Sequence, residues 1–230
     1  MFFGIDVTYL VLVLPAVLLA MWAQANVKST FAKYSRVASK RGMTGFDAAR
    51  RILDANGLSH VRVASVQGDL TDHFNPSDNT VYLSDTVHSV RSVAAIGVAA
   101  HEAGHAVQHA VGYSPMKLRA AIIPITNIGS NLAMPLILLG IVLSIPEIAL
   151  LGVAAFGLST LFQLVTLPVE FNASRRALEA LEGTLDNEER AQAKKVLTAA
   201  ALTYVAALAV SLANLIRLLL LVRGRDNRRR

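Results

Sequence analysis

Four long apolar stretches dominate the pattern of hydrophobic and polar positions along the chain. They cover residues 7–23, 120–144, 147–167 and 196–222, and none contains more than one charged residue. At about 1.5 Å per helical residue, each falls in the length range that crosses a ~30 Å hydrocarbon layer. The pattern therefore predicts a mainly α integral membrane protein with about four transmembrane helices. Because only a short turn separates the second stretch from the third, residues 120–167 are expected to form a transmembrane helical hairpin.

The first apolar stretch has two possible interpretations. The letters "AQA" at residues 23–25 resemble the cleavage site of a secretory signal peptide. A signal peptide, however, begins with Lys or Arg, whereas the residues before this stretch include neither and carry Asp6. The balance favours an uncleaved N-terminal transmembrane anchor over residues 1–24.

Shorter periodic segments fill residues 25–119 and predict a small α/β unit. "TGFDAARRILDANGL" has helical spacing of its apolar residues, with Thr44 as the N-cap and Gly57 at the C-terminal end. "HVRVASV" alternates as a strand, and "DLTDHF" and "TVYLS" flank a turn-rich loop, which predicts a β-hairpin. A further helix is expected to begin near residues 89–92.

The chain returns to polar sequence after the predicted hairpin. Residues 168–195 have a helical pattern, and Pro168 is suited to the first turn of a new helix. Residues 196–222 are expected to form a C-terminal transmembrane helix, with Arg217 extending towards a membrane interface. A basic tail, residues 223–230, follows.

Composition and charge support a membrane protein. Hydrophobic residues make up 53% of the chain, charged residues 17%, and the net charge is +6. The positive residues flank the apolar stretches and form no patch interleaved with aromatics, so we expect a lipid bilayer as partner and no nucleic acid. Lys and Arg concentrate in residues 28–41 and 175–195, which places both segments in the cytoplasm and the N-terminus outside. Four spans would then put the basic tail outside, against the same rule, so its side is left open.

The chemistry-bearing stretch is "HEAGH", residues 101–105, inside an otherwise apolar helix. Two histidines one helical turn apart can bind one Zn²⁺, and Glu102 is then placed as a general base that takes a proton from water at the metal. The absence of cysteine excludes a thiolate zinc site and a cysteine nucleophile. The alternative is a helix with incidental polar residues, but burying two histidines and a carboxylate without partners would cost several kcal/mol.

A zinc site needs a third protein ligand. His109 continues the four-residue spacing, but it lies eight residues after His101, about 12 Å along a straight helix, which is too far for a shared ion. It is therefore expected to be a histidine that supports a metal ligand without binding the metal, a histidine on the substrate side, or a plain surface histidine. Glu170, near the start of the predicted helix after Pro168, is the better candidate, with a carboxylate stabilised by the helix dipole as the alternative explanation. Glu179, Glu182 and Asp186 are weaker candidates.

Three motifs together carry a family resemblance. "GDLTDHFNPSDNTVYLSD", "GVAAHEAGHAVQHA" and "LPVEFNASRRAL" resemble the YugP-type neutral zinc metallopeptidases of bacterial membranes, over nearly the whole chain. The layout is more distantly similar to the HtpX/Ste24 membrane proteases. The resemblance implies one Zn²⁺ per chain, held by His101, His105 and Glu170, with Glu102 as the catalytic base. It departs from the HtpX/Ste24 pattern at Ser174, where those proteases have an Asp that orients a zinc-binding histidine. "HEAGHA" also resembles the protease domain of FtsH, but the phosphate loop of that enzyme's ATPase module does not occur here.

These observations predict a zincin-like catalytic unit with a β-hairpin at the cytoplasmic face of the cell membrane. The expected activity is that of a gluzincin-like metalloendopeptidase whose substrates are membrane-associated or unfolded proteins, in quality control or processing. The hairpin could hold an extended peptide, and His73 could reach the developing oxyanion, or be an ordinary surface histidine. The alternatives are a non-catalytic membrane scaffold with a structural zinc site and a metal transporter; the latter needs ionisable residues within the spans. The sequence leaves the oligomeric state open.

Overall fold

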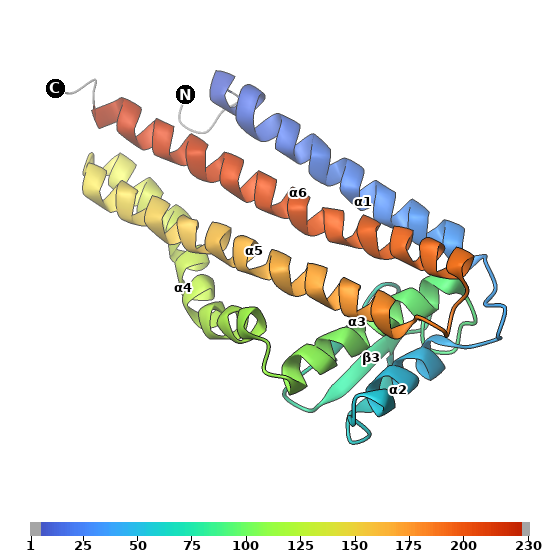
Figure 1. Cartoon of the computed structure of the whole chain (residues 1–230). Coiled ribbons are helices and arrows are strands. Elements are labelled where there is room, and N and C mark those ends of the chain that lie inside the picture. The colour runs from blue at the N-terminus through green and yellow to red at the C-terminus, as the bar shows by residue number, and fades with distance from the viewer. Residues whose placement is uncertain (1–5, 227–230) are drawn as a thin grey trace. The chain divides into compact units, whose positions relative to one another are not determined.

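The computed structural model describes residues 6–226 and is built mainly of long helices (Figure 1). Among the described residues four helices are long and apolar enough to cross a membrane: Tyr9–Ser35, Ser114–Val142, Pro146–Ala180 and Asn187–Gly224. The first consists of a π-helical turn, η1 (Tyr9–Val13), followed by α1 (Leu14–Ser35); the others are α4, α5 and α6, the last continuing to Asp226. The predicted mainly α membrane protein with four spans is confirmed.

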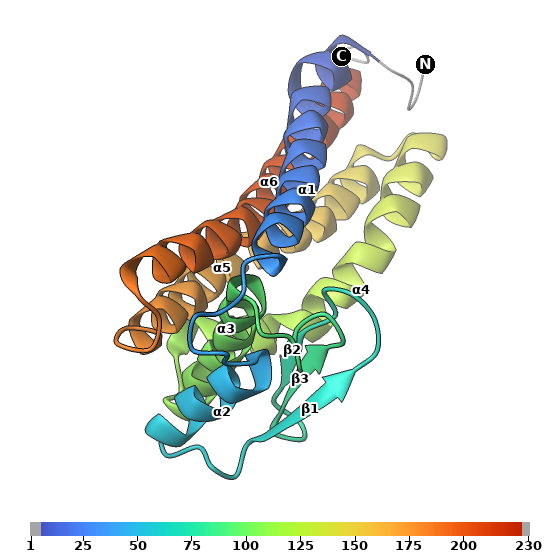
Figure 2. The ribbon, with the colours of Figure 1, turned by 90° about the vertical axis from the view of Figure 1, so that its right-hand side faces the viewer.

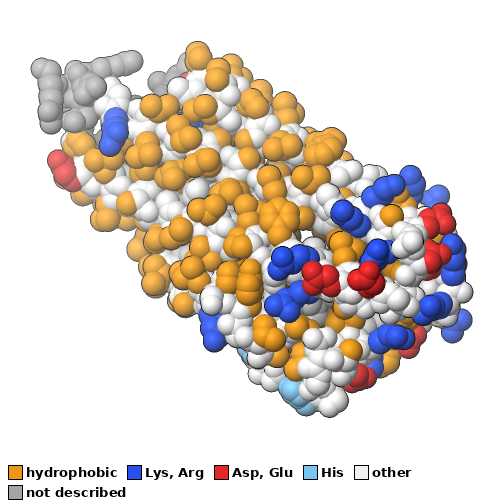
Figure 3. Space-filling model, in the orientation of Figure 1, with side chains coloured by type: hydrophobic (Ala, Val, Ile, Leu, Met, Phe, Trp, Pro, Cys, Tyr) orange, Lys and Arg blue, Asp and Glu red, His pale blue; other side chains and the backbone are white. Residues whose placement is uncertain are grey.

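The chain divides into two compact units. The helical unit comprises the described residues up to Ala23, then Leu118–Leu167 and the chain from Thr203 onwards. The α/β unit comprises Gln24–Lys117 and Pro168–Leu202. Hydrophobic side chains cover most of the visible surface over the helical unit, whereas charged side chains gather over the α/β unit (Figure 3).

Within the helical unit, α4 and the first part of α5 form the predicted antiparallel hairpin. Small residues bring the two backbones together: a Cβ on Gly152 would lie 2.7 Å from the carbonyl oxygen of Ala133. The expectation that Arg217 extends to a membrane interface stays a prediction. Its side chain is buried, lies 3.3 Å from the Asp6 carboxylate and covers the ring of Tyr9, because a charge inside a helix bundle needs a partner.

No new helix begins at Pro168, contrary to the sequence-based prediction. Helix α5 runs without interruption from Pro146 to Ala180, and Pro168 lies inside it. An interior proline removes one backbone hydrogen bond, at a cost of about 3 kcal/mol, and long apolar sequence on one side and helix-forming sequence on the other can outweigh that cost. Glu170 is therefore a residue of the interior of α5 and not of a first turn.

The α/β unit begins with helix α2 (Gly45–Ala55), whose ends follow local signals. Thr44 and Asp47 form a capping box, and Gly57 has a φ of +71°, the left-handed conformation expected after a helix end. Three strands follow: β1 (Arg62–Val66), β2 (His73–Asn75) and β3 (Thr80–Ser84). Strands β2 and β3 form the predicted hairpin, β1 pairs parallel with β3, and the order β1–β3–β2 leaves β2 at an edge (Figure 2).

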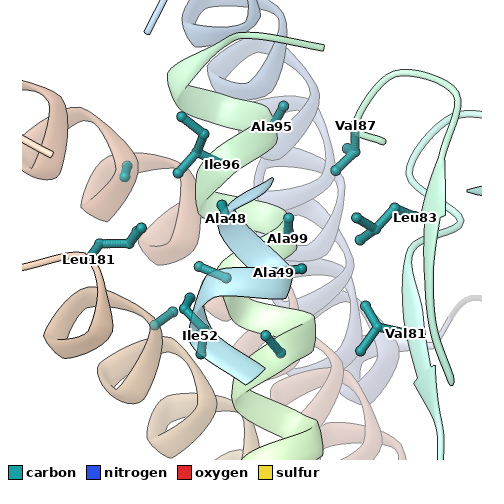
Figure 4. Packing of buried hydrophobic residues seen from close by; sticks show 14 of the residues in the cluster. Ala48, Ala49, Ile52, Val81, Leu83, Val87, Ala95, Ile96, Ala99 and Leu181 are labelled. Carbon is teal, nitrogen blue, oxygen red and sulfur yellow. The ribbon is translucent and has the colours of Figure 1, made fainter. Parts of the chain in front are cut away.

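Helix α3 (Val93–Ala110) lies at the centre of the α/β unit. The side chain of Ser92, within the predicted start region, caps it by accepting a hydrogen bond from the backbone of Ala95. Val81 and Leu83 of β3 point towards α3 from one side, and residues of α2 cover another (Figure 4). Most side chains of α3 are buried, so packing on several sides holds this helix and the polar residues that it carries.

Candidate metal centre

Two helices of the α/β unit supply the polar side chains of the candidate site. His101, Glu102 and His105 come from α3, and Glu170 comes from the part of α5 that belongs to this unit. Glu170 is only 2% exposed although it is a carboxylate. Acidic side chains are almost never buried to this extent without a positive partner, which already points to a cation at this position.

The ligand-type atoms of His101, His105 and Glu170 converge. They all lie within 4.8 Å of one another, and one Glu170 oxygen stands 3.3 Å from His101 Nε2 and 3.5 Å from His105 Nε2. Two ligand atoms bound at ~2.1 Å to a tetrahedral ion stand about 3.4 Å apart, so both separations fit zinc. A carboxylate oxygen and an unprotonated imidazole nitrogen repel at such distances, and this convergence therefore favours a cation or a proton between them.

A glycine permits the two helices to come this close. A Cβ on Gly104 would lie only 2.9 Å from the carbonyl oxygen of Ala173 on α5, a contact closer than real Cβ atoms make. Gly104 lies on the same helical stripe as His101 and His105. The absence of its side chain thus sets the distance between the two histidines and Glu170.

Each histidine has a polar partner at its other ring nitrogen. Nδ1 of His101 lies 3.2 Å from Ser174 Oγ, and Nδ1 of His105 lies 2.9 Å from Gln108 Oε1. Hydrogen bonds of this kind orient the ring of a metal-binding histidine. The Ser174 hydroxyl is a partner for His101 that adds no charge to the site.

The electrostatic environment couples the site to the end of the sheet. Burial alone would lower the pKa of His105, but the hydrogen bond to Glu170 and the charges of Glu102 and Glu170 outweigh it, and the pKa is raised. Burial raises the pKa of Asp72, and the nearby charge of Glu102 adds to this effect. Asp72 precedes β2 and accepts hydrogen bonds from the backbone and hydroxyl of Ser84, so it ties the edge strand to β3.

The remaining predicted site residues lie outside the cluster. His73 stacks on Tyr82, with ring centroids 5.0 Å apart, whereas its neighbour Phe74 packs against His109 of α3 at 5.7 Å. Since successive strand residues point to opposite faces, His73 faces away from α3, and this position does not support contact with an oxyanion at the metal. His109 is exposed in the last turn of α3.

Sequence reasoning missed four polar residues around the site. Gln108, Asn172 and Arg176 form a connected set of hydrogen bonds beside His105, and Asp72 lies beside Glu102. Only the spacing of these residues along the sequence could have indicated them. Gln108 follows His105 by three residues, and Arg176 follows Asn172 by four, which places each pair on one helix face.

Comparison with known proteins gives two concordant findings. The sequence profile of a family described as "Putative neutral zinc metallopeptidase" matches residues 9–223. A Bacillus subtilis (strain 168) protein described as "Putative membrane protease YugP" is 48% identical over 221 residues, which make up 95% of this chain and 98% of that protein. No solved structure matches the chain significantly. Both matches span the two units and the candidate metal centre.

Proposed function

Because this chain belongs to the neutral zinc metallopeptidase family, we propose that it is a membrane-embedded zinc endopeptidase that cleaves membrane-associated or unfolded proteins. The observation that carries the proposal is the convergence of His101, His105 and Glu170, with Glu102 adjacent in the sequence. Imidazole and carboxylate donors suit zinc, and three protein ligands leave one position free for water or substrate. A purely structural zinc site would have a fourth protein ligand, and the described cluster contains three.

Bound zinc would supply a Lewis acid that lowers the pKa of water to ~7 and polarises a peptide carbonyl. The residues of the chain perform the proton transfers. Glu102, buried beside the ligands, accepts a proton from the attacking water and then donates it to the leaving amine. Ser174 and Gln108 keep the two imidazoles oriented through the ring nitrogens that face away from Glu170.

The edge strand β2 is the proposed binding position for the substrate backbone. Among the described residues the sheet order leaves one side of β2 unpaired, and β2 contacts α3 through Phe74 and His109. An extended peptide can pair with such an edge and continue the sheet. This mode of binding requires an unfolded segment, which agrees with unfolded or membrane-associated proteins as the substrate class.

The test of the activity is Glu102→Gln, with Glu188→Gln as a matched control on an exposed carboxylate outside the metal-ligand cluster. An unstructured polypeptide fused to a single transmembrane helix serves as substrate. A general base contributes about 10²–10⁴-fold in rate, so Glu102→Gln should lose at least 100-fold in cleavage while retaining one zinc per chain. Glu188→Gln should match the wild type in both measurements. Cleavage by Glu102→Gln at the wild-type rate would refute the assignment, and absence of both zinc and cleavage in the wild type would refute the proposed function.

The cytoplasmic position of the site is a second testable part of the proposal. The chain has no cysteine, so single cysteines can be placed at exposed positions: Ser77 in the loop between β2 and β3, and Leu143 between α4 and α5. A membrane-impermeant maleimide added to intact cells should label Leu143→Cys, whereas Ser77→Cys should react only after permeabilisation. The opposite pattern would place the site outside the cell.

A further inference from the structure

Gln108 is a completely buried polar residue that connects the two helices of the site. Its side chain is 0% exposed, in the last turns of α3. Its Oε1 lies 2.9 Å from Nδ1 of His105, and its Nε2 donates to the carbonyl oxygen of Val169 at 2.8 Å and to Oδ1 of Asn172 at 2.9 Å. A buried amide with three partners of this quality is held in a single orientation.

The hydrogen-bonding capacities of its partners determine that orientation. Arg176 Nε donates to Asn172 Oδ1 at 2.8 Å, and because a guanidinium has only donors, the Asn172 atom that faces it must be the oxygen. That oxygen and the Val169 carbonyl are both acceptors, so the Gln108 atom that faces α5 must be the nitrogen. The Gln108 oxygen therefore faces His105, and it can only accept.

The consequence for His105 is a fixed tautomer. Its Nδ1 must carry the proton that Gln108 accepts, so Nε2, the atom directed at Glu170, is the nitrogen left to bind zinc. His101 has no such restriction, because the Ser174 hydroxyl at its Nδ1 can donate or accept. The two histidines of the cluster thus differ. Gln108 determines which nitrogen of His105 can bind the metal, whereas Ser174 is compatible with either tautomer of His101.

We propose that Gln108 is a positioning residue that fixes the Nδ1-protonated tautomer of His105 and joins α3 to α5, with its own orientation set by Val169 and by Arg176 through Asn172. The inference rests on the proposed zinc site for its effect on metal binding. The tautomer in question is the one in which Nε2 of His105 is available to bind zinc while Nδ1 donates to Gln108.

The direct test is NMR of the zinc-loaded Glu102→Gln protein labelled with ¹⁵N-histidine. Couplings between ring nitrogens and ring protons identify which nitrogen carries hydrogen, and the His105 signals are assigned by their loss in His105→Gln. We expect His105 to be protonated at Nδ1. Protonation at Nε2, or an equal mixture of tautomers, would overturn the proposal whether or not the protein is a peptidase.

Zinc affinity provides the second readout, measured by chelator competition in the Glu102→Gln background so that activity plays no part. Gln108→Leu keeps a similar side-chain volume but removes the hydrogen bonds to His105, Val169 and Asn172. Loss of such a partner lowers metal affinity about 10–100-fold, so this variant should bind zinc more weakly by that factor. Asn172 offers a matched pair in case Gln108→Leu does not fold: Asn172→Asp keeps the acceptor and should bind zinc like the parent, whereas Asn172→Leu should bind more weakly. Equal affinities for the Asp and Leu variants, or parental affinity in folded Gln108→Leu, would refute the positioning role.

Discussion

The close approach of α3 and α5 at Gly104 allows a quantitative test of how the metal centre is built. A Cβ added by Gly104→Ala would lie 2.9 Å from the carbonyl oxygen of Ala173, whereas ordinary contacts begin at 3.4 Å. Helices α3 and α5 would therefore have to separate by about 0.5 Å at this point. Metal–ligand distances tolerate only about ±0.2 Å, so a shift of this size pulls Glu170 away from the two histidines.

Gly97 supplies a matched control on the same helix. A Cβ at Gly97 would stand 3.5 Å from the Cβ of Ala193, which is an ordinary contact. Both substitutions gain about 0.8–1 kcal/mol of helix propensity, but only Gly104→Ala incurs the cost of overpacking, about 1–3 kcal/mol. Gly97→Ala should therefore be neutral or up to ~1 kcal/mol more stable than the wild type, and Gly104→Ala should be less stable than Gly97→Ala by about 1–3 kcal/mol.

The assay combines denaturant unfolding of the metal-free proteins in detergent with zinc affinity from chelator competition. Gly104→Ala should bind zinc at least ~10-fold more weakly than Gly97→Ala, since the displacement is comparable in effect to losing an orienting partner. If the two variants bind zinc within twofold of each other, the contact at Gly104 does not set the geometry of the ligands. If they are also equally stable, the close packing of α3 on α5 is itself refuted.

Three further predictions concern single side chains. Glu170→Ala should lose bound zinc in metal analysis of the purified protein, whereas His109→Ala should retain it; the reverse result would overturn the ligand assignment. Thr44→Ala removes the cap of α2 and should destabilise the protein by about 1 kcal/mol in denaturant unfolding at neutral pH. Hydrogen bonds from Thr44 hold the pKa of the Asp47 carboxyl below its usual 3.8, so the ionised carboxylate stabilises the fold at pH values above 3.8. The difference in free energy of unfolding between Thr44→Ala and the wild type should therefore shrink as the pH falls below 3.8. Asp72→Ala leaves buried donors at the end of β3 without their acceptor and should cost about 1–3 kcal/mol, more than Asp72→Asn, which keeps one acceptor; equal unfolding midpoints would contradict this.

Elements with local determinants could be predicted from the sequence. The capping box of Thr44 and Asp47, the glycine that ends α2 and the cap at Ser92 act within a few residues, and each lies where its pattern indicates. The four spans could also be predicted from the apolar stretches alone, because the thickness of a bilayer fixes the length of helix that crosses it.

Features that depend on distant contacts could not be predicted in this way. The continuation of α5 through Pro168 reflects the sequence on both sides of the proline, which outweighs its local effect. The parallel pairing of β1 with β3 joins segments whose patterns do not specify a partner. The face occupied by His73 follows from the packing of Phe74 against α3, and alternation alone does not say which face is the inner one.

The candidate site has a simpler description once the two helices are considered together. On α3, positions spaced as i, i+3, i+4 and i+7 form a single stripe, and they are His101, Gly104, His105 and Gln108. The contacts of this stripe fall on one face of α5: Glu170 and Ser174 at the histidines, Ala173 at the glycine, Val169 and Asn172 at the glutamine. A buried polar residue must find its partner on the element that covers it, so a polar stripe on an apolar helix implies a matching stripe elsewhere in the chain. Searching the sequence for that second stripe, and not for a third histidine on the same helix, leads to "VEFNASRR", which holds the proposed ligand Glu170, the Ser174 partner of His101 and the Val169 and Asn172 partners of Gln108.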